Sequence, residues 1–174
     1  MGKEYFKNDL TSVELASYIV NYCACHNKFI NMTKLQKLTY CVYGAFLVKN
    51  RKIISDRPKL WEHGPFFSKV FEFSLKHSLM PTDEFLNLFL DNESKFYSHF
   101  NDDELNLMNN VLKVFCNYSG KQLVDWSKSF ENPKSPWRLD LESGIPLHSE
   151  MTDKSIVEFF KTFIFVKSKD KNET

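Results

Sequence analysis

The placement of glycine limits both the fold and the chemistry open to this chain. Its five glycines stand at positions 2, 44, 64, 120 and 144, and with the six prolines they make up less than 7% of the 174 residues. Sandwiches and barrels of β-strands need turn residues at every hairpin, so this scarcity favours helices. Glycines so far apart also cannot form the Gly-rich loop that cradles phosphates in nucleotide-binding proteins.

Local capping signals and apolar stripes predict helices along most of the chain. Thr11 and Glu14 form a capping box, a pair of side chains that satisfies the first free amides of a helix. Apolar residues then recur every three or four positions, which is the period of one helical face. The predicted helices run over 12–26, from Asn31 or Thr33 to about 50, from Pro65 to about 78, over 82–91, from Asn101 to a left-handed stop at Gly120, from Ser119 to before Pro133, and from Thr152 through Ile164, with a short turn at 136–141.

One short region has strand character instead. Residues 52–54 and 59–62 are β-branched or aromatic and predict a small extended pair or hairpin, although Pro58 makes the second arm a poor central strand. We therefore predict a mainly α fold, with about six to seven helices and at most one small β-hairpin. The chain is expected to form a single compact domain over 1–174, with its core at about 10–166 and a frayed tail at 167–174.

Signatures of enzymes, metals and membranes are absent from the sequence. No phosphate loop, dinucleotide fingerprint, zinc-protease motif or nucleophile elbow occurs. Cys23, Cys25 and His26 are the best metal candidates, but positions i and i+2 of a helix point to different faces, which favours core packing over zinc. We expect no enzymatic activity, cofactor or metal. A polar start and the lack of any long apolar run favour a cytoplasmic protein with free thiols.

The charge is nearly neutral overall but unevenly distributed. The formal net charge is +1, whereas residues 28–59 carry +7 and residues 83–104 carry −6. One interpretation is a pair of ordinary solvated faces. The other is a dipolar surface that steers a charged partner.

Two segments combine a tryptophan with a proline-fixed turn, namely residues 61–65 and 135–138. A structural interpretation packs both tryptophans on the helices, lets Gly64 form the turn and uses Arg138 to neutralise Glu62 or to cap carbonyls. It predicts that the Glu62 and Arg138 side chains meet. Phe67, Val70 and Phe71 are expected to form the core stripe of the following helix, which leaves Phe66 free for a partner.

Three segments together resemble one protein family. Residues 33–40 (TKLQKLTY) resemble its LKLQKLLYF helix, and residues 60–65 (LWEHGP) with Val70-Phe71 resemble its W-x-x-GPV…VY segment. Pro136-Trp137-Arg138 resembles its PW site, and residues 155–160 its closing helix. The order and spacing agree over roughly residues 10 to 162, so the chain is similar to Panacea antitoxin domains, also called SocA-like or phage-associated GepA-like.

The resemblance implies a helical, non-enzymatic antitoxin of a bacterial or prophage type II toxin–antitoxin pair. Members of the family neutralise diverse toxins by direct protein contact, and SocA-like members also act as adaptors that deliver a toxin to a Clp-type protease. The chain departs from the family pattern at Phe66-Phe67, where small aliphatic residues are usual, and at Cys41-Val42-Tyr43. The first departure indicates a re-tuned partner surface. No added DNA-binding domain is visible, which argues against autoregulation through DNA.

These observations give two hypotheses for function. The leading one is a toxin-binding module whose contact residues are Lys34, Lys37, Trp61, His63, Phe66 and Trp137, with lysines at the rim and aromatic residues as anchors. In it, Glu62, Gly64, Pro65 and Arg138 are structural motif residues. The rival is a nucleic-acid-binding regulator that uses the basic stretch at 28–59. The expected partner is a cognate toxin, encoded by the adjacent gene.

Overall fold

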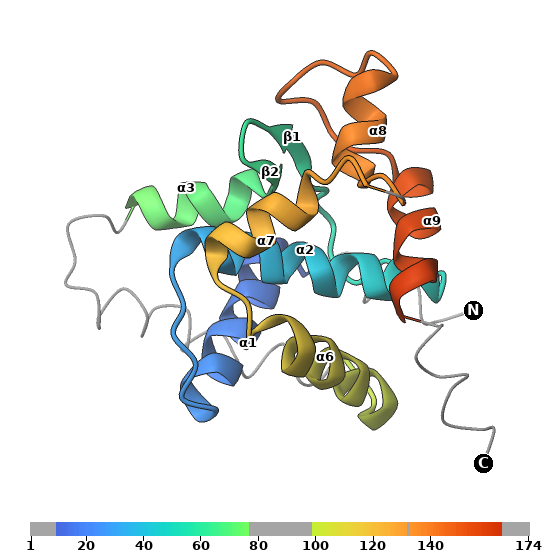
Figure 1. Cartoon of the computed structure of the whole chain (residues 1–174). Coiled ribbons are helices and arrows are strands. Elements are labelled where there is room, and N and C mark those ends of the chain that lie inside the picture. Colours follow the sequence, from blue (N-terminus) through green and yellow to red (C-terminus); the bar gives the residue numbers. More distant parts are fainter. Residues whose placement is uncertain (1–9, 77–98, 132, 165–174) are drawn as a thin grey trace.

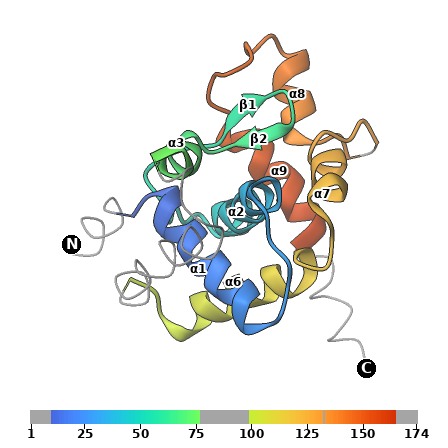
Figure 2. The ribbon, with the colours of Figure 1, turned by 90° about the vertical axis from the view of Figure 1, so that its left-hand side faces the viewer.

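The computed structural model describes residues 10–76, 99–131 and 133–164. Helix α2 (Met32–Val48) lies at its centre, with α1 (Ser12–Cys25), α6 (Asp102–Phe115), α7 (Gly120–Ser127) and α9 (Asp153–Ile164) packed around it (Figure 2). Thirteen of its 17 residues are buried, because neighbours cover it on several sides. A helix that is covered all round must also bury polar residues, and α2 buries two lysines, a glutamine and a threonine.

The helix starts follow the predicted caps. Thr11 and Glu14 form the capping box of α1, Asn31 caps α2, and two further boxes open α6 and α7. The remaining helices are α3 (Ser68–Lys76) and α8 (Pro136–Glu142), of which α8 is capped by Ser135. The described part thus holds seven helices, and the mainly α prediction is confirmed. The helix predicted at 82–91 lies outside the described residues.

The predicted role of Gly120 is wrong. Helix α6 ends earlier, at Phe115, and Gly120 is the first residue of α7. A Cβ atom at this position would come within 3.3 Å of the Asn31 side chain and of the Lys34 backbone nitrogen. The absence of a side chain therefore lets the start of α7 approach the start of α2.

The hairpin forms with a different pairing from the predicted one. Strands β1 (Lys59–Trp61) and β2 (Gly64–Phe66) pair antiparallel, with Leu60 opposite Pro65, while residues 53 and 54 are buried without a strand partner. Pro65 therefore lies in a strand and does not begin α3. The physical reason is long-range, since Gln36 on α2 holds both the N–H and the carbonyl of Phe67 and keeps this stretch extended.

A loop segment covers the second edge of the hairpin. Leu60 donates to the carbonyl of Ser149 at 2.9 Å, and Met151 donates to that of Pro58, also at 2.9 Å. This places residues 148–151, from the connection between α8 and α9, alongside β1. In Figure 1 the hairpin lies beside α3 and α8, at the edge of the helical layer. None of the described helices is long and apolar enough to cross a membrane.

Candidate partner-binding surface

The hairpin turns one face to the core and the other to solvent. Leu60 and Pro65 are opposite each other in register and both are buried. Because side chains alternate across a strand, Trp61 and Phe66 lie on the outward face, and both are half-buried. Their ring centroids are 4.5 Å apart. Two residues predicted to contact a partner thus pack against each other at the surface.

Two further rings extend this pair into a row, which we call the aromatic ladder (His148, Trp61, Phe66 and Phe71). The His148 ring lies 4.3 Å from that of Trp61, and the Phe71 ring 5.4 Å from that of Phe66. Phe71 is 37% exposed, so its predicted place in the core stripe is wrong. Phe67, which precedes α3, and Val70 are both buried as predicted. The ladder is therefore assembled from three separate segments.

His148 reaches the ladder through an unusual backbone conformation. Its φ angle is 71°, in the left-handed region, and its N–H donates to the carbonyl of Leu60. The imidazole Nε2 lies 3.1 Å from the Glu62 carboxylate. The pKa of Glu62 is lowered, first by a hydrogen bond from its own backbone N–H and then by His148. No pattern in the sequence pairs His148 with the hairpin, because the contact depends on the course of the loop.

The predicted contact between Glu62 and Arg138 is wrong. The Arg138 guanidinium lies 3.3 Å from the centroid of the Phe130 ring and donates to the carbonyl of Lys128. Glu62 faces His148 instead. His63, at the tip of the turn, is exposed.

Three side chains from other elements fix the hairpin backbone. Trp137 Nε1 donates to the Trp61 carbonyl at 2.8 Å, and Lys37 Nζ donates to that of Pro65 at 2.9 Å. Lys128 Nζ donates to the carbonyl of Glu62 at 2.6 Å. Donors on α2, on α8 and after α7 thus hold three of the six carbonyls between Trp61 and Phe66, which makes the hairpin a rigid platform.

The prediction that Lys34, Lys37 and Trp137 are surface contacts for a partner does not fit the structure, because all three side chains are buried. Their exposed fractions are 6%, 3% and 4%. Lys34 Nζ donates to the carbonyl of Cys116 at the end of α6, where a cation is favoured by the helix dipole. Burial lowers the pKa of Lys37 to about 8. Lys34, Lys37 and Trp137 therefore form hydrogen bonds within the protein and are not part of its surface.

Gly64 forms the turn as predicted, and it also allows a close approach. Its φ is +96°, and a Cβ atom there would lie 2.4 Å from the hydroxyl oxygen of Ser127 at the end of α7. Any side chain would therefore collide with α7 as well as strain the turn.

The basic stretch at 28–59 presents less free positive charge than its sequence indicates, which weakens the case for nucleic-acid binding. Two of its eight basic residues are the buried lysines of α2. Arg51 pairs with Glu104, and Arg57 pairs with Asp153 at 3.0 Å. The remaining basic residues are Lys28, Lys49, Lys52 and Lys59. Half of the positive charge is therefore taken up inside the protein or by carboxylates.

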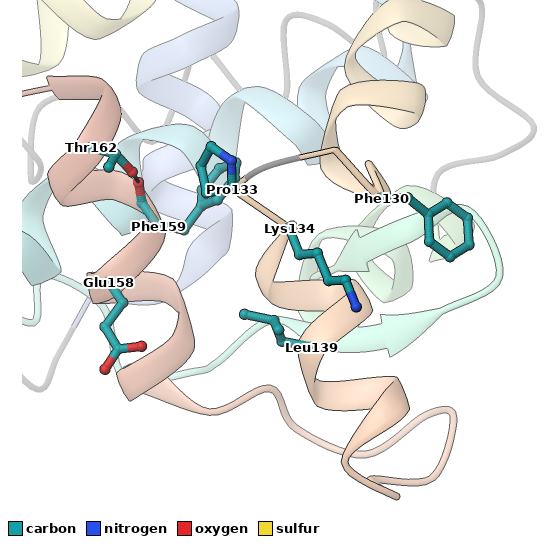
Figure 3. Close-up of a pocket in the computed structure, with 7 residues that line it drawn as sticks. All are labelled: Phe130, Pro133, Lys134, Leu139, Glu158, Phe159 and Thr162. Atoms are coloured by element: carbon teal, nitrogen blue, oxygen red, sulfur yellow. Dashed lines mark hydrogen bonds between the residues drawn. The ribbon is translucent and has the colours of Figure 1, made fainter.

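An apolar hollow between α8 and α9 is another candidate site. Its volume is about 430 Å³, and Figure 3 shows Leu139 of α8 and Phe159 of α9 among its lining residues, with Phe130 at its edge. Lys134 and Glu158 bring both signs of charge to it, and Lys134 also pairs with Glu142 at 2.9 Å. This mixture favours no particular partner chemistry, so the hollow is a weaker candidate than the ladder.

Comparison with known proteins places the chain in a family. No curated protein and no solved structure matches it. The family model described as antitoxin SocA-like, Panacea domain, matches residues 35–137, which is more than half of the chain and includes most of α2, the hairpin and Trp137. The chain therefore belongs to the family of SocA-like antitoxins with a Panacea domain.

Proposed function

We propose that this protein is the antitoxin of a type II toxin–antitoxin pair and that it neutralises its toxin by binding it through the aromatic ladder. The observation that carries the proposal is the row of partly exposed rings on the hairpin face of an antitoxin-like domain. Exposed apolar rings in contact with one another are typical of protein interfaces, in which tryptophan dominates the binding energy.

The rigidity of the hairpin supports this role. Side chains of Lys37, Lys128 and Trp137 hold its carbonyls before any partner arrives. A surface that is fixed in advance loses little conformational entropy on binding, which favours affinity. The ladder is thus suited to be the anchor of the interface, with His63 and Glu62 as polar contacts beside it.

Other features of the proposal come from the family. We propose a binding module without catalytic activity that acts in the cytoplasm on a toxin encoded by the neighbouring gene of a bacterial or prophage locus. Delivery of the toxin to a Clp-type protease is a further proposal, and it requires that the toxin be degraded only when this chain is present.

Co-expression tests the proposal. The product of the neighbouring gene, induced alone, should stop growth, and co-expression of this chain should restore it and give a complex on size-exclusion chromatography. A neighbouring product that is harmless alone, or a toxic one that this chain neither binds nor neutralises, contradicts the proposal.

A pair of matched variants tests the surface. Phe66→Asp places a charge in the ladder and should abolish neutralisation. Phe29→Asp changes a phenylalanine that is 76% exposed in the loop between α1 and α2, so it should leave neutralisation intact. Both proteins should keep the far-ultraviolet circular dichroism of the native chain. Equal activity of the two variants shows that the ladder is not the interface.

A further inference from the structure

The Trp61 indole carries a polar atom that the protein itself leaves unused. Its Nε1–H group is buried and has no hydrogen-bond acceptor in the described structure. An indole nitrogen can only donate, and a buried donor without an acceptor costs about 1–3 kcal/mol. Trp137 shows the usual arrangement, since its indole N–H donates to a carbonyl. The open donor of Trp61 lies in the proposed interface.

Two rings pack against the indole of Trp61, and they are held in place by different parts of the chain. Phe66 belongs to the hairpin itself, whereas His148 comes from the neighbouring loop. The loop backbone is pinned by hydrogen bonds to Leu60, but the imidazole is held by stacking and by a 3.1 Å polar contact with the Glu62 carboxylate, in which both side chains are about half exposed. Exposed pairs contribute about 0–1 kcal/mol. Of the two rings against the indole, His148 is therefore the one whose side chain moves away at least cost.

We infer that toxin binding turns the His148 imidazole away from Trp61 and that an oxygen atom of the toxin accepts the Trp61 indole N–H. This inference rests on the proposed function and adds the polar contact at its centre. The toxin surface that fits is apolar, to cover Phe66 and Phe71, and presents one oxygen acceptor among its apolar groups. Such an acceptor satisfies the donor in a site from which the rings exclude water, where one hydrogen bond discriminates strongly.

The role of His148 as a cover is tested in the free protein. Hydrogen exchange of the indole N–H groups is followed by NMR on the ¹⁵N-labelled full chain, and the Trp61 signal is the one lost in Trp61→Phe. His148→Ala should speed its exchange at least about tenfold, because the cover is removed. His63→Ala, which changes the exposed histidine of the same turn, should leave the rate unchanged. An unchanged rate in His148→Ala overturns the inference.

The contact itself is tested with the purified product of the neighbouring gene. Trp61→Phe keeps an aromatic ring and removes the donor, so its complex should be about tenfold weaker. His148→Ala should bind up to about fivefold more tightly, since no imidazole has to be displaced. Unchanged affinity of Trp61→Phe, or weaker binding of His148→Ala, overturns the inference. If the native chain does not bind the product at all, the proposed function itself fails, whereas the exchange experiment separately decides whether His148 covers the indole.

Discussion

The indole Nε1 of Trp137 donates a 2.8 Å hydrogen bond to the carbonyl oxygen of Trp61 and so joins two tryptophans 76 residues apart. Trp137 is a buried residue of α8, and Trp61 lies in the aromatic ladder. The two tryptophans belong to separate motifs in the sequence, yet they form one unit in which Trp137 holds the hairpin backbone and Trp61 lies half-buried in the surface row of rings.

Substitution of each tryptophan by phenylalanine should separate these roles. Trp137→Phe removes the donor to the Trp61 carbonyl and should lower the free energy of unfolding by about 1–3 kcal/mol. Trp61→Phe removes an N–H group that has no acceptor but also removes ring contacts, and because these two effects oppose each other we expect a net change below about 1 kcal/mol. Urea unfolding followed by circular dichroism measures both. Equal losses contradict the division of roles.

Glycine at position 64 is predicted to be irreplaceable for two reasons, and Gly144 provides the control. Both have φ +96°, which costs an alanine about 1–2 kcal/mol. At Gly144 nothing lies within 4 Å of an added Cβ atom, whereas at Gly64 it would lie 2.4 Å from Ser127 Oγ. Gly64→Ala should therefore destabilise by a further 1–3 kcal/mol or so beyond Gly144→Ala.

The predicted clash between a Cβ atom at position 64 and the Ser127 hydroxyl can be tested by removing that hydroxyl. Ser127→Ala deletes the hydroxyl, which is buried and donates to the carbonyl of Val124. In the Gly64→Ala background it should recover part of the loss, giving a coupling of at least 0.5 kcal/mol or so in a double-mutant cycle of urea unfolding. Strict additivity means that the hydroxyl is not the obstacle.

Local interactions explain which elements were predictable. The capping boxes at 11–14, 101–104 and 119–122 join side chains three residues apart, so the sequence contains all of their parts. The start of α3 was mispredicted because Gln36, 31 residues away, holds Phe67 extended. Hydrogen bonds of this range leave no mark in a local pattern.

The candidate site was predictable in composition more than in geometry. Trp61 and Phe66 do lie together at the surface. Lys37 was predicted at the rim of the interface because it is charged. Its Nζ instead donates a hydrogen bond to the Pro65 carbonyl of the hairpin inside the protein. His148 and Phe71 were missed, the first because a loop brings it in and the second because helical spacing assigned it to the core.

Helix α9 is anchored by a buried carboxylate whose removal should be costly. Asp140 accepts hydrogen bonds from the backbone N–H of Thr152 at 2.7 Å and from the hydroxyls of Thr152 and Ser155 at 2.8 and 2.9 Å. Asp140→Asn removes the negative charge and one hydrogen-bond acceptor at the start of α9. The free energy of unfolding should therefore fall by about 1–3 kcal/mol. The control is Asp125→Asn, which affects only an exposed pair with Lys121 and should cost less than about 0.5 kcal/mol. Differential scanning calorimetry compares the two.

Burial of Lys37 should leave a signature in the pH dependence of stability. The pKa of its amine is lowered from 10.5 to about 8, mainly because burial disfavours the charged form. Between pH 8 and 10.5 the unfolded chain therefore holds a proton that the folded chain has lost, and the folded state gains stability as pH rises. The full effect corresponds to about 3 kcal/mol. Below pH 8 the lysine is charged in both states, so its contribution is constant there.

Lys37→Met isolates this contribution, because methionine fills a similar space without titrating. Other buried groups act in the opposite direction in the same window, since burial raises the pKa of Cys23 to about 11 and so favours unfolding above pH 9. That effect is common to both proteins and cancels in their difference. Urea unfolding at pH 7.5 to 10.5 should show the native chain gaining about 3 kcal/mol relative to Lys37→Met. A difference that stays flat across this range means that Lys37 keeps its charge up to pH 10.5, so that the Pro65 carbonyl is held by a cation above pH 8 as well as below it.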